Sequence, residues 1–163
     1  MGEIRIEVLL TNVIDEGIAR RGTIDASEVR KMPVNALVDT GAIRCVVPVH
    51  VVDQLGLATV DRAVAEYADG RQETVDVTEP IVFEIMGRRT RDEALVLGDE
   101  VLIGQTVLEK LDLVADCANQ RLLPNPDHPD QPVSKVKFNR SRHDKNDAAL
   151  QSRAGWEIQG GNR

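Results

Sequence analysis

The alternation of apolar and polar positions predicts a series of short strands along the first 124 residues. Aliphatic side chains occupy every second position from 4 to 10, which is typical of a strand with one buried face. The mostly aliphatic run 34–38 indicates a buried strand. Segments 60–67 and 72–77 flank an Asp69-Gly70 pair, a dipeptide that strongly favours a tight β-hairpin. The pattern therefore predicts an all-β fold.

Two short helices are expected among these strands. Pro48 stands where a helix favours its first residue, two helical turns follow to residue 55, and Gly56 is a natural helix end. Apolar residues within 105–111 have helical spacing. We expect a loop or a loose hairpin over 12–27, and further strands over 28–31, 43–47, 81–86, 90–97, 101–104, 114–117 and 121–123.

Length and composition indicate one folded domain followed by a polar tail. The chain has 163 residues, and 42% of them are apolar, which is enough for one core of ordinary size. Aromatic residues make up only 2%, so aliphatic side chains must line the core and any pocket. After residue 124 the chain is rich in proline and in polar and charged residues. We expect a domain over 1–126 and a flexible tail over 127–163.

The charge and the cysteines argue against several classes of partner and site. A net charge of −7 argues against nucleic acid and anionic membranes as partners. No apolar stretch approaches the roughly 18 residues of a membrane helix, and the first residues do not resemble a signal peptide, so a cytoplasmic location is expected. Cys45 and Cys117 lie far apart in apolar stretches, so we expect two buried thiols and neither a metal site nor a cofactor. The histidines His50, His128 and His143 are expected at the solvated surface.

The sequence Asp39-Thr40-Gly41-Ala42 directly follows the buried strand 34–38 and carries the candidate chemistry. A carboxylate at the end of a buried strand is costly to desolvate unless hydrogen bonds, a partner charge or a shared proton compensate it. Thr40 can supply a hydroxyl, and Gly41 allows the backbone to approach closely. The alternative is a structural carboxylate that caps a turn.

The order of these motifs resembles that of the retropepsin-like (clan AA) aspartic proteases. The resemblance lies in Asp39-Thr40-Gly41-Ala42 after an apolar strand, followed about 60 residues later by Leu102-Ile103-Gly104, a short helix and a last hairpin. The cellular and bacterial branch, similar to the DNA-damage-inducible protease domain, is nearer than the viral branch, because the chain continues past the helix into that hairpin. The resemblance implies a small, closed, β-barrel-like acid protease lobe. The segment 12–32 is longer than the minimal connection of the family, and the hairpin tip has only Gly70.

An aspartic endopeptidase that works as a homodimer is the function that this resemblance implies. Peptide hydrolysis by carboxylates needs two of them facing one water, and this chain has one Asp-Thr-Gly triplet, so the second must come from another copy. Asp39, Thr40 and Gly41 would form the catalytic turn. Ala42 and the hairpin residues Tyr67, Ala68, Asp69 and Gly70 would contact an extended peptide, with the hairpin acting as a flap.

Simpler interpretations exist for the same residues. Asp69 and Gly70 can form an ordinary hairpin tip, and Tyr67 can fill the core or a sheet edge. The alternative function is a catalytically idle peptide-binding or dimerisation module of the same fold. A phosphoryl-transfer enzyme with Asp39 as nucleophile is disfavoured, because no basic phosphate clamp or helical phosphate loop is close in the sequence.

Overall fold

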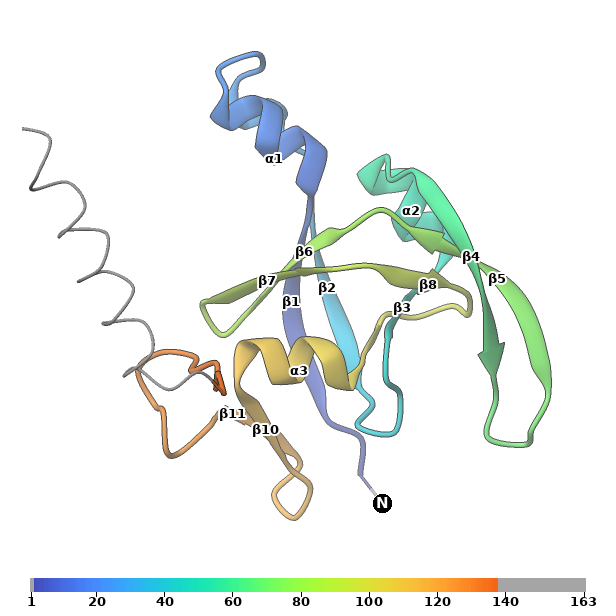
Figure 1. The fold of residues 1–163 in the computed structure, drawn as a ribbon, viewed down its shortest axis with the longest axis vertical. Helices are drawn as coiled ribbons and strands as arrows, with labels where there is room; N and C mark the ends of the chain where they lie inside the picture. The colour runs from blue at the N-terminus through green and yellow to red at the C-terminus, as the bar shows by residue number, and fades with distance from the viewer. Residues whose placement is uncertain (1, 138–163) are drawn as a thin grey trace, which may run out of the picture. The chain divides into compact units, whose positions relative to one another are not determined.

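The computed structural model describes residues 2–137 of the chain (Figure 1). Every helix and strand reported below belongs to one compact unit, Met1–Val133. Most of the expected tail over 127–163, including His143, lies outside the described residues. The boundary expected at residue 126 stays a prediction.

Within residues 2–137, nine strands form one sheet, and two more form a separate hairpin. The order in the large sheet is β4-β5-β8-β3-β9-β2-β1-β6-β7, and β10 pairs with β11. The strands are β1 (Arg5–Asn12), β2 (Lys31–Val38), β3 (Cys45–Val47), β4 (Thr59–Glu66), β5 (Gln72–Thr78), β6 (Ile81–Ile85), β7 (Arg88–Asp92), β8 (Ala94–Val96), β9 (Leu102–Ile103), β10 (Leu113–Asp116) and β11 (Arg121–Pro124).

The all-β class is confirmed, but the expected closure into a barrel is wrong. β4 pairs only with β5 and β7 only with β6, so the large sheet has two edges. β5 is joined to β8 at a single register position, Val77 opposite Leu95. Most of the β4–β5 hairpin therefore extends beyond the rest of the sheet, as Figure 1 shows.

The expected loop over 12–27 is also wrong, because the chain forms helix α1 (Val13–Arg20) and the short 3₁₀ helix η1 (Ala26–Glu28) there. Asn12 begins α1: its side-chain oxygen accepts hydrogen bonds from the backbone N–H groups of Ile14 and Asp15, each at 3.0 Å. The Asn12 amide nitrogen also donates to the Leu55 carbonyl at 2.8 Å. The residue is 1% exposed, so it fixes the start of α1 against the end of α2.

The other two helices lie where the sequence predicts them. Helix α2 (Val49–Leu55) follows Pro48 and ends at Gly56, whose φ of 61° is the left-handed conformation that glycine favours. Helix α3 (Gln105–Leu111) buries one apolar face. The expected strand over 90–97 is two strands, β7 and β8, that pair with different neighbours.

The core is almost entirely aliphatic, as the composition requires. The described residues include one large cluster of buried side chains that joins the sheet to α2 and α3. Its largest fully buried members are Phe83, Leu10, Leu55, Ile81, Ile85, Ile103 and Leu111. Burial of a side chain of this size contributes about 1.5–3 kcal/mol relative to an exposed one.

A buried arginine attaches the segment after β11 to the end of α3. Arg88 is 7% exposed, and its guanidinium donates to the carbonyls of Leu111 and Asp112 at 2.9 Å and of His128 at 2.8 Å. His128 Nδ1 lies 2.6 Å from the Asp112 carboxylate. His128 is therefore half-buried and bound, contrary to expectation, whereas His50 is exposed as expected.

Candidate active site

Asp39 lies directly after β2, where the short strand β9 is inserted between β2 and β3. β9 runs parallel to β2, with Leu37 opposite Leu102 and Val38 opposite Ile103, and antiparallel to β3. The Asp39 backbone N–H donates to the Ile103 carbonyl at 3.0 Å. The connection between β2 and β3, residues 39–44, is called the Asp39 turn below. The Asp39 turn therefore connects β2 and β3, both of which pair with the two-residue strand β9.

The carboxylate of Asp39 is oriented by its own turn. Its Oδ1 accepts the Gly41 backbone N–H at 3.0 Å, and the Ala42 N–H donates to the Asp39 carbonyl at 3.3 Å. A Cβ on Gly41 would stand 3.3 Å from that same Oδ1, which is tighter than ordinary contact. Gly41 therefore leaves room for the carboxylate to bend back over the turn. These hydrogen bonds also fit a turn-capping carboxylate, so geometry alone allows both interpretations.

The first turn of α3 holds the Asp39 turn from the other side. The backbone N–H of Gln105 donates to the Ala42 carbonyl at 2.8 Å, and that of Thr106 donates to the Ile43 carbonyl at 3.0 Å. The Thr106 hydroxyl donates to Asp92 of β7 at 2.7 Å. The first N–H groups of a helix have no partner within the helix, so the two carbonyls of the turn satisfy them.

Gly104 permits this close approach; the sequence predicts a structural role for Leu102-Ile103-Gly104, packing beside the Asp39 turn, but not the need for glycine. A Cβ at this position would lie 2.5 Å from the Arg44 carbonyl oxygen and 3.0 Å from that of Ile43. Its φ of −90° is open to any residue, so space and not backbone conformation requires glycine. The position of Gly104 before a helix, after an aliphatic pair, is the only sequence signal for this contact.

The two cysteines, both of which follow the Asp39 turn in the sequence, differ in environment. Cys45 is buried, and its sulfur accepts the Gly104 N–H at 3.3 Å. Burial raises the pKa of the Cys45 thiol to about 12, so it stays a neutral thiol at ordinary pH. Cys117 is exposed, contrary to expectation, because it follows β10 in the turn of the last hairpin.

The surface of the Asp39 turn is open. Asp39 and Ala42 are half-buried, whereas Thr40 and Gly41 are exposed. Ile43 is 73% exposed. Neither of two surface cavities, of about 280 Å³ and about 240 Å³, is lined by this turn.

The predicted flap residues form the tip of the β4–β5 hairpin. The Gly70 N–H donates to the Tyr67 carbonyl at 2.8 Å, and Gly70 has a φ of 82°, which its lack of Cβ allows. The Tyr67 hydroxyl donates to Glu73 at 2.7 Å, and the Arg71 guanidinium lies 5.0 Å from the Tyr67 ring centre. The Arg71 side chain also pairs with Asp69 at 2.7 Å. Tyr67 is therefore a hairpin residue with local partners and not part of the core.

The structure groups the predicted residues into two separate turns. Residues 39–42 lie together with the start of α3, and residues 67–70 lie together at the hairpin tip. No hydrogen bond or ion pair within the described part of the chain joins the two turns. In Figure 1 both turns lie toward the lower end of the view.

A protein-family model described as "gag-polyprotein putative aspartyl protease" matches residues 26–110, which is just over half of the 163-residue chain. The chain belongs to this aspartyl protease family. The expected membership of the retropepsin-like aspartic proteases is thereby confirmed. The aspartyl protease match includes the Asp39 turn, the β4–β5 hairpin and most of α3, and it begins after α1.

Solved structures of similar proteins include viral and cellular proteases. The EIAV protease complexed with the inhibitor HBY-793 is 18% identical, with 66% of this chain and 86% of that chain covered and a TM-score of 0.47. The Simian Foamy Virus (mac) protease is 18% identical, with 64% and 90% covered and a TM-score of 0.41. The retroviral protease-like domain of Ddi1 from Leishmania major is 12% identical, with 85% and 97% covered and a TM-score of 0.47. No curated protein sequence matches the chain.

Two further findings concern the described residues of this aspartyl protease family member. Residues 2–137 contain no group of three or more His, Cys, Asp or Glu side chains arranged to hold a metal ion. Within the same residues, none of the helices has the length and apolar character needed to cross a membrane.

Proposed function

We propose that the protein is an aspartic endopeptidase that hydrolyses peptide bonds as a homodimer, with one Asp39 from each subunit. Membership of the aspartyl protease family carries this proposal. The hydrogen-bonded position of Asp39 after β2 supports it, because a catalytic carboxylate must be held in a fixed orientation.

The need for a second carboxylate supports a dimer. Activation of a water and protonation of the substrate carbonyl require one carboxylate that takes a proton and one that gives a proton. The only hydrogen bond from a described residue to the Asp39 carboxylate comes from the backbone of Gly41, and the sequence has one Asp-Thr-Gly triplet, so a second copy would supply the second acid. A two-fold axis beside the Asp39 turn brings two copies of the same acid together.

The exposed surface of the turn is suited to such an interface. Thr40 and Gly41 are exposed beside the half-buried acid, and Ile43 presents 73% of its surface. A second copy would cover these residues and exclude water from the paired carboxylates, which strengthens their interaction.

The mechanism follows from two acids that share one proton. The ionised carboxylate takes a proton from the bound water, whose oxygen attacks the carbonyl carbon of the peptide. The protonated carboxylate gives its proton to the carbonyl oxygen. The resulting tetrahedral diol then breaks its C–N bond: the first acid gives the nitrogen the proton that it took from water, and one hydroxyl of the diol returns a proton to the second carboxylate. The two acids are thereby restored without a covalent enzyme intermediate.

The substrate is an extended peptide with hydrophobic side chains beside the scissile bond. Ala42 and Tyr67, Ala68, Asp69 and Gly70 of the hairpin contact it, and the hairpin closes as a flap. The edge position of β4 supports movement of this hairpin, since β5 is tied to the sheet at only one register position. A cytoplasmic location stays a prediction from the sequence.

Incubation with a mixed peptide library at several acidic to neutral pH values tests the proposal. Purified wild type, Asp39→Asn and the control Asp53→Asn are compared, with cleavage products identified by mass spectrometry. Asp53 is an exposed acid on α2 and serves as the matched control. We expect cleavage by wild type and Asp53→Asn and none by Asp39→Asn. Binding of peptides without cleavage by all three proteins would identify the idle binding module instead.

Mixing of the two subunit types tests the shared site. If each dimer needs two Asp39 side chains, an equal mixture of wild type and Asp39→Asn retains about one quarter of the activity of the same total amount of wild type. A monomeric enzyme would retain about one half. The sedimentation of wild type across concentration shows whether dimers are present at the assay concentration.

A further inference from the structure

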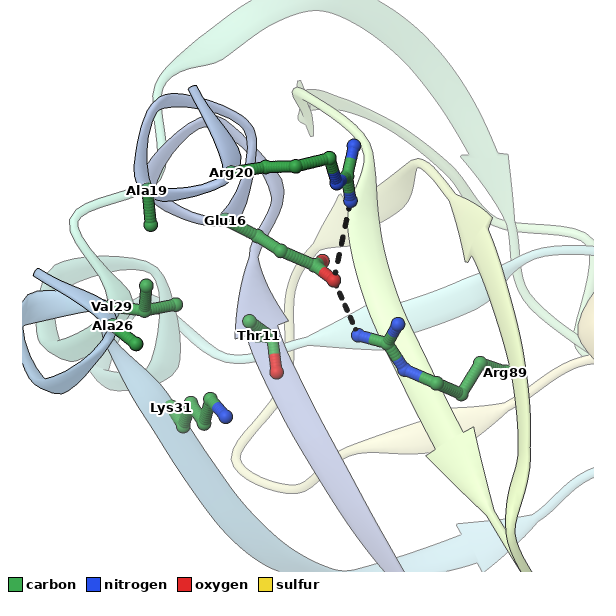
Figure 2. A pocket seen from close by; sticks show the side chains of 8 residues that line it. All are labelled: Thr11, Glu16, Ala19, Arg20, Ala26, Val29, Lys31 and Arg89. Carbon is green, nitrogen blue, oxygen red and sulfur yellow. Dashed lines mark hydrogen bonds and ion pairs between the residues drawn. The ribbon is translucent and has the colours of Figure 1, made fainter. Parts of the chain in front are cut away.

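A charged cavity lies at the opposite end of β2 from the Asp39 turn. It has a volume of about 280 Å³ and is lined by residues of α1, η1, β1, β2 and β7 (Figure 2). Lys31, which lines it, is the first residue of β2, and Asp39 follows the last. Because a strand rises about 3.3 Å per residue, the backbones of these two residues are roughly 26 Å apart.

The lining residues make this cavity basic on a protein that is acidic overall. Three cations, Arg20, Lys31 and Arg89, and one acid, Glu16, line it, whereas the whole chain has a net charge of −7. Figure 2 shows the guanidinium groups of Arg20 and Arg89 converging on the Glu16 carboxylate. Arg89 donates to Glu16 Oε1 at 2.8 Å, and Arg20 lies 3.5 Å from the same oxygen. The surplus of positive charge suits an anionic group.

One polar group of the cavity has unused hydrogen-bonding capacity. Glu16 Oε2 is buried and accepts no hydrogen bond from residues 2–137, and its closest ion-pair partner, Arg91, lies 3.9 Å away. The buried Thr11, which is 2% exposed, lines the same cavity. A buried acceptor without a donor costs about 1–3 kcal/mol, so such a group is normally satisfied by something in its cavity.

Glu16 is ionised in this environment. Burial raises its pKa, but the hydrogen bond from Arg89 and the charges of Arg89, Arg91 and Arg20 outweigh that effect and hold the pKa below its usual value. An ionised Oε2 is an acceptor only, so a ligand must present a donor to it.

The remaining wall of the cavity is apolar and small. Ala19, Ala26 and Val29 line it together on the side of α1 and η1. Helix α1 lies outside the residues 26–110 that the aspartyl protease model matches, so one wall of the cavity lies outside that match. These short side chains form a small apolar surface against which a short aliphatic side chain can pack.

We infer that this cavity binds an α-amino carboxylate with a small side chain, either as a free amino acid or as the C-terminal residue of a peptide. The ligand carboxylate is bound by Lys31 and Arg89, and the nitrogen on the adjacent carbon donates to Glu16 Oε2. The small side chain packs against Ala19, Ala26 and Val29. This inference does not depend on the proposed peptidase activity, because it uses none of the residues of the Asp39 turn.

Titration of the full chain with small probes, followed by ¹H–¹⁵N NMR, tests the inference. Alanine and N-acetylalanine represent the two sources of the ligand. O-acetyllactate replaces the N–H of N-acetylalanine by an ester oxygen, N-acetylalaninamide lacks the carboxylate, and inorganic phosphate is an anion without either feature. We expect shifts at Thr11, Glu16, Lys31 and Arg89 with alanine, N-acetylalanine or both, and affinity weaker by on the order of tenfold or more for the ester and the amide.

Variants distinguish binding in this cavity from nonspecific binding to surface charge. Lys31→Gln and Arg89→Gln should each weaken binding by on the order of tenfold, whereas Arg62→Gln should leave it unchanged, because Arg62 is 75% exposed on β4. Lys31 has an exposed side chain, so its variant tests binding even if Arg89→Gln unfolds. Asp39→Asn should bind the probes as wild type does.

The same experiment has clear negative outcomes. The absence of shifts with both alanine and N-acetylalanine at millimolar concentration would overturn the inference. Equal affinity for N-acetylalanine and O-acetyllactate, or tighter binding of phosphate, would show a general anion site and overturn the role of Glu16. A response to alanine alone identifies a free amino acid as the ligand, and a response to N-acetylalanine alone identifies a peptide terminus.

Discussion

Replacement of Gly104 by alanine should displace the Asp39 turn by a predictable amount. The new Cβ would lie 2.5 Å from the Arg44 carbonyl oxygen, and ordinary contact begins at 3.4 Å. Either the turn or the start of α3 must therefore move by up to 0.9 Å, the difference between these two distances. The obstructing atoms belong to the backbone, so no side-chain rotation can relieve the contact.

The expected cost in stability is modest, whereas the expected cost in activity is large. Insertion of a methyl group into a packed site costs about 1–3 kcal/mol, and the smaller entropy of the unfolded alanine chain offsets about 0.4–1 kcal/mol. We expect a loss of about 1–2 kcal/mol in the free energy of unfolding. If Asp39 is catalytic, a misplacement near 1 Å should lower kcat about 100-fold.

Urea unfolding and peptide cleavage, measured on the same samples, check this prediction. The matched control is Gly17→Ala in α1, where the new Cβ would meet only the flexible end of Arg21 at 3.5 Å. That variant should be as stable as wild type or slightly more stable, with unchanged cleavage. If Gly104→Ala behaved as Gly17→Ala does in both measurements, close packing at Gly104 would not be what positions the Asp39 turn.

Two further predictions concern stability. Asp15 is 6% exposed, and its bidentate pair with Arg30, at 2.7 and 2.8 Å, lowers the pKa of Asp15. The pair therefore stabilises the fold at pH values above the usual aspartate pKa of about 3.9, and this stabilisation is lost as the pH falls below that value. Asp15→Asn should cost about 1–3 kcal/mol at neutral pH and less near pH 3 in urea titrations, and a pH-independent difference would contradict this sign. Arg88→Met should cost about 2–4 kcal/mol and increase amide hydrogen exchange over 128–133, whereas the exposed Arg91→Met should do neither. Unchanged exchange would show that Arg88 does not fasten that segment.

Local signals were sufficient wherever a turn residue or a helix end determines the structure. Gly56 ends α2 in the left-handed conformation, and Gly70 closes the β4–β5 hairpin, as their positions between periodic segments predict. The strand before Asp39 was likewise evident from its aliphatic run, although β2 begins at Lys31 and absorbs part of the separate strand expected over 28–31. These features depend on the conformational preferences of a few adjacent residues.

Helix α1 was missed because its signals are weak and mostly distant. Gly17 lowers helix propensity in its centre, and a helix of 8 residues is too short to be stable by itself. Its stability comes from the Asn12 cap, which also binds the end of α2, and from the pair between Asp15 and Arg30. Asn followed by acids was the available local signal for a helix start.

The surroundings of His128 were also not predictable from the local sequence. A proline-rich sequence around it predicts a solvated segment, yet its ring lies beside Asp112 and its carbonyl is bound by Arg88. Asp112 has a φ of 53° at the end of α3, which directs its carboxylate to receive both His128 and Asn125. Contacts across 13 to 40 residues of sequence fix this arrangement, and no local pattern contains them.

Both local turn residues and distant backbone contacts position the Asp39 turn. Its anchors to α3 and β9 are backbone groups: the N–H of Asp39 and the carbonyls of Ala42 and Ile43. The side chains of Thr40 and Ile43 are therefore not needed to hold the turn in place. They are free to serve the face that meets a second subunit or a peptide, while Gly104 fixes the position of the acid. Substitutions at Ile43 should accordingly alter association or substrate choice with little effect on folding, whereas those at Gly104 should displace the acid itself and lower kcat.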